Sequence, residues 1–272
     1  RARRGRRCEE AVRSRGAGAR QVSVRLGGDG RGRREMVELF GVCDGRTRAI
    51  FINAPGNPTG GVMPRADQRA VLDECRRRGI WLIADEVYIR LAYETDLPLG
   101  RAPCLLDIAK ADDRLIVINR FSKFWLMTGW RLGWLVHPPV LGPVFSKLNE
   151  FNVASPTTFV QHAGVVAMRN GEPFVAEMVE RYRRNRDLVF QRLAGMPRVR
   201  LARPEGAFYA FFAVDGMTDS VAYAKQLIAE TGVGMAPGRA FGESGEGWLR
   251  LCFAAEAATL SKAMDRLESK FS

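Results

Sequence analysis

The chain has little of the chemistry that binds metals or forms disulfides. Its 272 residues include two histidines, and its five cysteines are widely spaced, with no Cys-x-x-Cys pair. An odd number of scattered cysteines argues against a disulfide framework and against a zinc site. We therefore expect no metal centre and a reducing, cytoplasmic setting.

Long hydrophobic runs are also absent from the sequence. No apolar run approaches the roughly 18 residues that span a bilayer, and no apolar segment follows the basic N-terminal end as it would in a secretory signal. We expect no membrane partner. The hydrophobic content of 46% is enough to bury a core, as one large domain or one and a half.

Lysine is scarce, with six among 42 basic residues, and the net charge of +12 is unevenly placed. Residues 1–40 hold twelve arginines and five acidic residues. Residues 1–20 show neither helical nor strand periodicity, which predicts a basic, disordered arm. A nucleic-acid-binding arm is the alternative, but no aromatic residues interleave these arginines to stack on bases, so a nucleic-acid partner is not expected.

Three apolar, β-rich runs follow at Arg48–Asn53, Ile80–Asp85 and Arg114–Asn119. A helical pattern separates the first two, with Pro64 suited to its start and Gly79 to its end. Another helical segment is expected between the second and third runs. Strands and helices that alternate in this way predict βαβ units on a mostly parallel sheet with flanking helices.

The remaining sequence mixes both patterns. A further strand is expected at residues 131–136, and helices at 140–150, 156–169 and 173–193. Beyond these we expect strands at 198–201, 207–212 and 248–253, and helices at 220–231 and 255–271. The fold class is thus α/β with a smaller α+β C-terminal domain. The expected division is 1–20 as the arm, 21–172 as the large domain, and 173–272 as an interdomain helix with the small domain.

Three polar residues of different chemistry follow the carboxyl ends of three predicted strands: Asn57, Asp85 and Lys123. In open α/β sheets, ligands bind at this edge. Lys123 lies in the aromatic-rich stretch FSKFWLMTGWR, where a charged amine is costly to bury. An amide, an acid and an amine at one sheet edge therefore indicate a shared site.

Four motifs carry a family resemblance: NAPGNPTGG, ADEVY, FSKFWLMTGWRLGW and GWLRLCFA. The intervals are 28 residues from Asn57 to Asp85, 38 to Lys123, 8 to Arg131 and 119 to Arg250. In order and spacing they resemble the class I/II aminotransferases of the fold-type I pyridoxal-phosphate family, from about Gln21 to the C-terminus. The resemblance implies pyridoxal 5'-phosphate as cofactor, amino acid and 2-oxo acid substrates, a role in amino acid metabolism, and a homodimer.

The resemblance also implies catalytic roles. Lys123 would form the internal Schiff base and then move the proton at the substrate Cα as general base and acid. Asp85 would face the pyridine nitrogen and keep it protonated. Asn57 and Tyr88 would hydrogen-bond the ring's phenolic oxygen. Taken alone, Asp85 could equally be a strand-end acid in a salt bridge or helix cap, and Asn57 a turn residue.

Two further roles concern anionic groups. Ser122 and Arg131 resemble the family's phosphate ligands, since the guanidinium fork suits a dianion and the hydroxyl adds a donor. Arg250 resembles the arginine that grips the substrate α-carboxylate, with Asn57 also on the substrate side. The alternative for Arg250 is an ordinary surface arginine, but its place in an apolar strand favours the binding role.

The chain departs from the family at its N-terminal end. Family members carry a substantial segment upstream of the matching motifs, which supplies phosphate and ring contacts that cannot be assigned here. The resemblance therefore implies a partial large domain, apparently without the N-terminal part. The alternatives to a transaminase are another fold-type I enzyme of the lyase or decarboxylase kind, since the same carbanion can partition several ways, or an inactive truncated remnant.

Overall fold

The computed structural model describes residues 16–20, 22, 24–26, 32–34 and 36–271. The arm predicted for residues 1–20 thus lies outside the described residues except for its last five, which are exposed. Among them, Arg20 forms an exposed ion pair of 2.7 Å with Asp44. No helix of the described residues is both long enough and apolar enough to cross a membrane.

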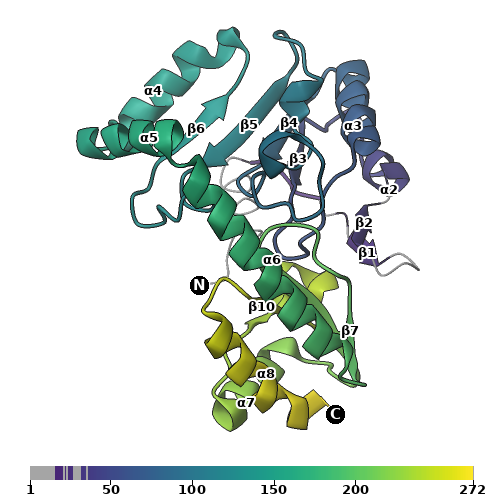
Figure 1. Cartoon of the computed structure of the whole chain (residues 1–272). Coiled ribbons are helices and arrows are strands. Elements are labelled where there is room, and N and C mark those ends of the chain that lie inside the picture. Colours follow the sequence, from purple (N-terminus) through teal and green to yellow (C-terminus); the bar gives the residue numbers. More distant parts are fainter. Residues whose placement is uncertain (1–15, 21, 23, 27–31, 35, 272) are drawn as a thin grey trace.

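The first sheet has the strand order β3-β4-β5-β6 (Figure 1). Its strands are β3 (Ala49–Asn53), β4 (Trp81–Asp85), β5 (Leu115–Arg120) and β6 (Gly133–Val136). The first three are parallel to one another, and β6 pairs antiparallel with β5. The predicted mostly parallel sheet is therefore confirmed, with an antiparallel strand at one edge.

Helix α3 (Arg65–Arg78) connects β3 to β4, with the boundaries that the sequence predicts. Pro64 precedes its first turn with φ −60°, and Gly79 ends it in the left-handed conformation at φ 66°. Val71, Leu72 and Cys75 are buried at helical spacing, in one cluster with side chains from one face of the sheet.

The helix predicted between β4 and β5 is wrong. The connection contains only two short 3₁₀ turns, Pro98–Gly100 and Leu105–Asp107. Pro98, Gly100 and Pro103 break any longer helix here, since proline removes a backbone donor and glycine pays extra conformational entropy. Leu99 accordingly sits at φ 60°, outside helical space.

The C-terminal region is built on a second sheet with the order β7-β8-β10-β9, antiparallel throughout. Its strands are β7 (Val199–Leu201), β8 (Tyr209–Val214), β9 (Ala236–Pro237) and β10 (Trp248–Cys252). Helices α7 (Ser220–Thr231) and α8 (Ala257–Phe271) accompany this sheet, with the turn η4 (Gly238–Phe241) before β10. Helices α4 (Gly142–Val153) and α5 (Thr158–Asn170) instead lie beside β6 of the first sheet, and α6 (Glu172–Ala194) follows them (Figure 1).

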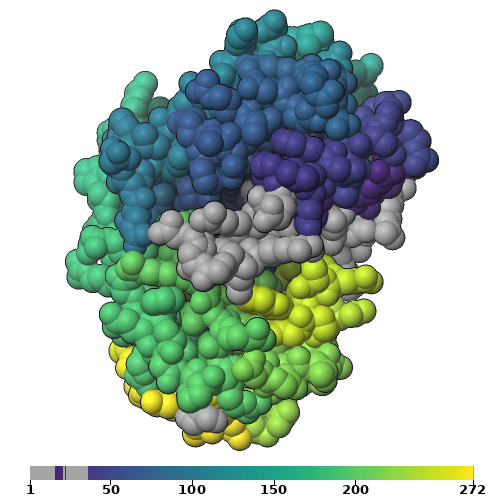
Figure 2. Space-filling view, turned by 90° about the vertical axis from the view of Figure 1, so that its right-hand side faces the viewer, coloured from purple at the N-terminus to yellow at the C-terminus, as the bar shows by residue number. Residues whose placement is uncertain are grey.

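Helix α6, 23 residues long, runs from the first sheet to the second (Figure 1). Near the N-terminal end of the described chain are the short strands β1 (Val24–Leu26) and β2 (Gly32–Arg34), and helix α2 (Met36–Gly41). The space-filling view shows the purple-to-teal residues as one lobe and the green-to-yellow residues as the other (Figure 2). The predicted fold class, α/β with a smaller α+β C-terminal domain, is confirmed.

Candidate functional site

The carboxyl ends of the parallel strands bring three predicted site residues to one sheet edge. Asn53, the last residue of β3, lies beside Asp85, the last residue of β4, which in turn lies beside Ile118 of β5. Asn57 and Lys123 occupy the loops that follow β3 and β5. The parallel register therefore places an amide, a carboxylate and an amine at the same edge.

Asn57 is fixed by a short chain of hydrogen bonds along this edge. Its backbone N–H donates to Asn53 Oδ1 at 2.7 Å, and Asn53 Nδ2 donates to the backbone carbonyl of Asp85 at 2.9 Å. The Asp85 carboxylate accepts a 3.4 Å contact from the backbone N–H of Val87. The β3 loop and the end of β4 thus hold each other in place.

Arg250 reaches this edge from the second sheet. Its Nη1 donates to Asn57 Oδ1 at 2.7 Å, across 193 residues of sequence. The guanidinium carbon lies 4.2 Å from the Tyr209 ring centroid and 4.7 Å from that of Phe241, at cation–π distance from both. Arg250 Nε is buried without a hydrogen-bond partner among the described residues. A guanidinium with a buried, unsatisfied N–H is suited to an anionic ligand.

Lys123 lies among aromatic rings, but not those that flank it in the sequence. Its Nζ is 5.5 Å from the ring centroids of both Tyr88 and Phe208. The sequence neighbours Phe121, Phe124 and Trp125 pack on one another instead. Trp125 stacks on Phe121 at 4.7 Å between centroids and lies 4.5 Å from Phe124. These rings fix the loop, while the amine faces a different aromatic wall.

Tyr88 is fully buried beside the lysine. Its hydroxyl is 3.2 Å from the hydroxyl of Tyr209, and its ring meets Phe208 edge-on at 5.5 Å between centroids. Tyr209 is also the ring beneath Arg250. Tyr209 therefore links the predicted catalytic tyrosine with the predicted substrate arginine.

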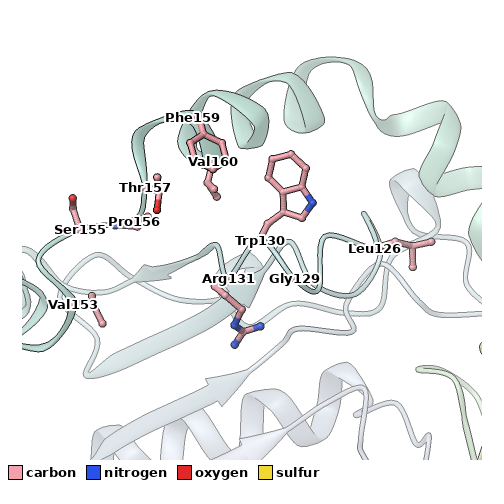
Figure 3. Close-up of a pocket in the computed structure, with 10 residues that line it drawn as sticks. All are labelled: Leu126, Gly129, Trp130, Arg131, Val153, Ser155, Pro156, Thr157, Phe159 and Val160. Carbon is pink, nitrogen blue, oxygen red and sulfur yellow. The ribbon is translucent and has the colours of Figure 1, made fainter.

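Ser122 and Arg131, the predicted phosphate ligands, are joined through Thr128. The Thr128 hydroxyl donates to the Ser122 carbonyl at 2.8 Å, and Arg131 Nη1 donates to the Thr128 carbonyl at 3.0 Å. Ser122 is buried and Arg131 is exposed, with a left-handed φ of 58°. Arg131 lines an open pocket of about 640 Å³ with Trp130 and Phe159, and Figure 3 shows its guanidinium pointing away from both rings.

Glu86, which directly follows β4, is held by hydrogen bonds to the turn at residues 104–105. Its carboxylate accepts hydrogen bonds at 2.9 Å from the Cys104 thiol and from the Leu105 backbone N–H. Burial raises the pKa of the Glu86 carboxyl above its ordinary value, and burial also raises the pKa of the Cys104 thiol to about 12. Glu86 thus ties the residue after Asp85 to the turn at residues 104–105.

The residues of the site that were not predicted from the sequence include Asn53, Phe208, Tyr209 and Phe241. Asn53 could have been found, because it ends the first apolar run at the same edge as Asp85. Tyr209 and Phe241 carry no such pattern. They meet Arg250 only through the pairing of β8 with β10 and the fold of the η4 turn.

Comparison with characterised proteins places this geometry in a family. Residues 18–267 match the family described as aminotransferase class I and II. The chain is 35% identical over 260 residues to the aromatic-amino-acid aminotransferase 2 of Thermococcus litoralis, covering 93% of this chain and 64% of that protein. It is 35% identical over 233 residues to the aspartate aminotransferase of Thermotoga maritima, covering 86% and 58%.

Solved structures agree with these similarities. The crystal structure of the aromatic aminotransferase from Pyrococcus horikoshii OT3 superposes with a TM-score of 0.85 at 33% identity, over 93% of this chain and 67% of that one. The alanine aminotransferase from Pyrococcus furiosus gives a TM-score of 0.86 at 25% identity, over 96% and 66%. The chain thus spans about three fifths of the length of the curated relatives, 64% and 58% for the two above. With a family match over most of its length and an architecture that superposes on these structures, the chain belongs to the class I and II aminotransferases, a pyridoxal-phosphate-dependent family.

Proposed function

We propose that the chain provides the cofactor and substrate groups of a pyridoxal-phosphate-dependent transaminase, which moves an amino group between an α-amino acid and a 2-oxo acid. The observation that carries this proposal is the 2.7 Å hydrogen bond from Arg250 to Asn57. This bond connects Arg250 to the sheet edge that bears Asp85 and Lys123. The buried Nε of Arg250 has no hydrogen-bond partner among the described residues. A carboxylate-binding group and an amine-bearing loop therefore belong to one site.

The residues present fit the cofactor. Pyridoxal phosphate supplies an aldehyde that bonds to amines and a ring that accepts electron density from the substrate Cα. An amine at Lys123 suits the aldehyde, a carboxylate at Asp85 suits the ring nitrogen, and donors at Ser122 and Arg131 suit the phosphate. Since Asn57 Oδ1 is taken by Arg250, its Nδ2 is the end that can donate to the phenolic oxygen, together with the Tyr88 hydroxyl.

In this proposal each residue has a defined task. Lys123 Nζ takes the proton from the substrate Cα and returns it as general base and acid, which typically contributes ~10²–10⁴-fold to a rate. Arg250 holds the α-carboxylate, and its aromatic neighbours keep the guanidinium in one orientation. Residues 21–172 would hold the cofactor, residues 173–272 would bring Arg250, and two copies would form a homodimer.

Covalent capture of the cofactor tests the proposal directly. Purified protein is incubated with pyridoxal phosphate, reduced with borohydride and mapped by mass spectrometry. We expect one adduct, at Lys123, and none in a Lys123→Arg variant. Lys110 and Lys147, which lie on the same lobe, serve as internal controls. An adduct spread over several lysines, or none at Lys123, contradicts the assignment.

A further inference from the structure

An arginine is buried in the middle of the helix that runs between the two lobes (Figure 1). Arg186 of α6 is 2% exposed, so its guanidinium lies away from solvent. A charged side chain is costly to bury unless opposite charges and hydrogen bonds compensate for the lost water. The partners of Arg186 therefore indicate what this charge does in the structure.

These partners come from three separate parts of the chain. Arg186 Nη1 donates to Glu94 Oε1 at 3.2 Å, in the connection between β4 and β5, and to the Pro204 backbone carbonyl at 3.3 Å, before β8. Arg186 Nε donates to Asp187 Oδ1 at 2.9 Å, within α6. The guanidinium carbon lies 4.8 Å from the Tyr93 ring centroid. One side chain thus links the β4–β5 connection, helix α6 and the segment that leads into the second sheet.

A second arginine contacts the same two carboxylates. Arg203 Nη1 lies 2.9 Å from Glu94 Oε1, and Arg203 Nη2 lies 3.0 Å from Asp187 Oδ1. The side chains of Arg203, Glu94 and Asp187 are between 34% and 51% exposed, whereas that of Arg186 is 2% exposed. Ion pairs in solvent contribute little, so Arg186 is the member of this group whose contacts hold most strongly.

The segment at residues 204–207 is also hydrogen-bonded directly to the first lobe. The backbone N–H of Gly206 donates to the Gly60 carbonyl at 2.8 Å, and that of Ala207 donates to the Leu91 carbonyl at 2.8 Å. A Cβ on Gly206 would lie 2.7 Å from the Leu91 carbonyl oxygen, so this close approach requires glycine. The segment therefore has little room to shift against the first lobe while these contacts are kept.

The same segment leads directly into two aromatic residues of the candidate site. The Phe208 ring centroid lies 5.5 Å from Lys123 Nζ, and that of Tyr209 lies 4.2 Å from the Arg250 guanidinium carbon. The Tyr209 hydroxyl lies 3.2 Å from that of Tyr88. A shift of the segment would therefore move the aromatic rings that face the amine and the guanidinium of the site.

We propose that Arg186 is a positioning residue that holds the 204–207 segment between the lobes. By fixing this segment it sets where Phe208 and Tyr209 lie in the candidate site. Arginine suits this task because its planar fork can donate to a carboxylate and a carbonyl at once while its face lies over a ring. The hold on the segment rests on these contacts alone, whereas its consequence for ligand binding rests on the proposed function.

Hydrogen exchange measures the hold without cofactor or activity. In the full chain carrying Arg186→Met, the amides of residues 205–207 should exchange about tenfold faster than in the wild type, because local opening becomes easier. Amides in the centres of the two sheets, at residues 82–84 and 249–251, should change by less than about twofold, which separates a local effect from general destabilisation. Arg186→Lys, which keeps the charge but loses the fork, is the second variant and should show the same local increase.

A matched control is Arg192→Met, on the same helix. Arg192 also pairs with two carboxylates, Asp265 at 2.8 Å and Glu268 at 2.9 Å, but both belong to α8 of the second lobe. Because these pairs do not reach the 204–207 segment, Arg192→Met should leave the exchange of residues 205–207 within about twofold of the wild-type rate.

The consequence for the site is measured by calorimetric titration of cofactor-loaded protein with pyruvate. Arg186→Met should weaken pyruvate binding about tenfold, since a small displacement of positioning groups is costly in a binding site. Arg192→Met should bind as the wild type does. If the wild type binds no cofactor, the proposed function fails, while the exchange rates still test the hold on the segment.

Three results would overturn the proposal. The first is that both Arg186 variants keep the wild-type exchange rate at residues 205–207, or that Arg192→Met raises this rate as much as Arg186→Met does. The second is an equal rise at the centres of the two sheets, which would make Arg186 a stabilising residue only. The third is faster local exchange with wild-type affinity for pyruvate, which would remove its effect on the site.

Discussion

Each of the two sheets has one packed face, and they differ in what the second face carries. In the antiparallel sheet, Phe212 and Leu249 face α8 and the core without exposure, while the second face bears Arg250 and Tyr209. In the parallel sheet, the second face bears Phe51 with Ile83 and Ile116 beside it. Polar and aromatic groups suit a ligand, whereas branched apolar groups suit another protein layer. The two sheets thus differ in the chemistry of their second faces.

The largest effect should come from the packed face of the antiparallel sheet. Phe212→Ala removes a fully buried ring and should lower the free energy of unfolding by about 3–5 kcal/mol. Phe51→Ala, on the second face of the parallel sheet, should cost under about 1 kcal/mol because Phe51 is already 47% exposed. Urea unfolding of both variants measures the contrast. Equal losses would contradict the difference in burial between Phe212 and Phe51.

On the face of the antiparallel sheet that bears Arg250, a substitution should leave the protein folded but weaken ligand binding. Arg250→Ala removes the group proposed to bind the substrate carboxylate, and losing a charge-assisted pair worth about 1.5–3 kcal/mol should weaken 2-oxo acid binding by roughly 10- to 100-fold. Calorimetric titration of cofactor-loaded protein with pyruvate measures this. Arg200→Ala, which removes an exposed arginine paired with Asp215 in the same sheet, is the control. Wild-type affinity in Arg250→Ala would remove Arg250 from the site.

Glu86, the residue after β4, should make the stability of the protein depend on pH. Because burial raises the pKa of Glu86 above 4.5, the folded protein keeps a proton that the unfolded chain releases. Stability should therefore fall as pH rises from about 4.5 through the raised pKa, by about 1.4 kcal/mol for each pH unit that separates the folded and unfolded pKa values. Glu86→Gln should flatten this fall in urea unfolding between pH 4 and 7.

The contribution of Asp113 to stability should change with pH in the opposite direction to that of Glu86, so Asp113 serves as a comparison. The hydrogen-bonded Arg76 guanidinium lowers the pKa of Asp113 below 3.8, so its contribution is present above that pH and is lost as pH falls. Asp113→Asn should therefore remove stability at neutral pH and leave the slope above pH 5 unchanged. If both variants change the slope in the same direction, the assignment for Glu86 is wrong.

A smaller effect than that of Phe212→Ala should come from the contact between the lobes. Tyr209→Phe removes the hydroxyl 3.2 Å from that of Tyr88 but keeps the ring under Arg250. We expect a loss of about 0.5–1.5 kcal/mol in unfolding free energy, and a further loss in Tyr209→Leu, because the cation–π contact also disappears. A larger loss from the phenylalanine than from the leucine variant would contradict this order.

Much of the fold could be predicted because its signals are local. Pro64, Gly79 and the apolar spacing of Val71, Leu72 and Cys75 are enough to define α3. The prediction of a helix between β4 and β5 was wrong because the prolines and a glycine in this connection prevent a longer helix. Residues 131–136 alone do not predict whether β6 pairs parallel or antiparallel with β5, since a short apolar run is compatible with both.

For the candidate site, sequence order determined which residues share a sheet edge. Asn57, Asp85 and Lys123 follow strands that become parallel neighbours, so their convergence follows from the βαβ pattern. Only the tertiary structure brought Arg250 to Asn57, placed Lys123 against Tyr88 and Phe208, and left Phe51 exposed. These contacts join segments far apart in the chain, and long-range packing, unlike local periodicity, leaves no regular spacing in a sequence.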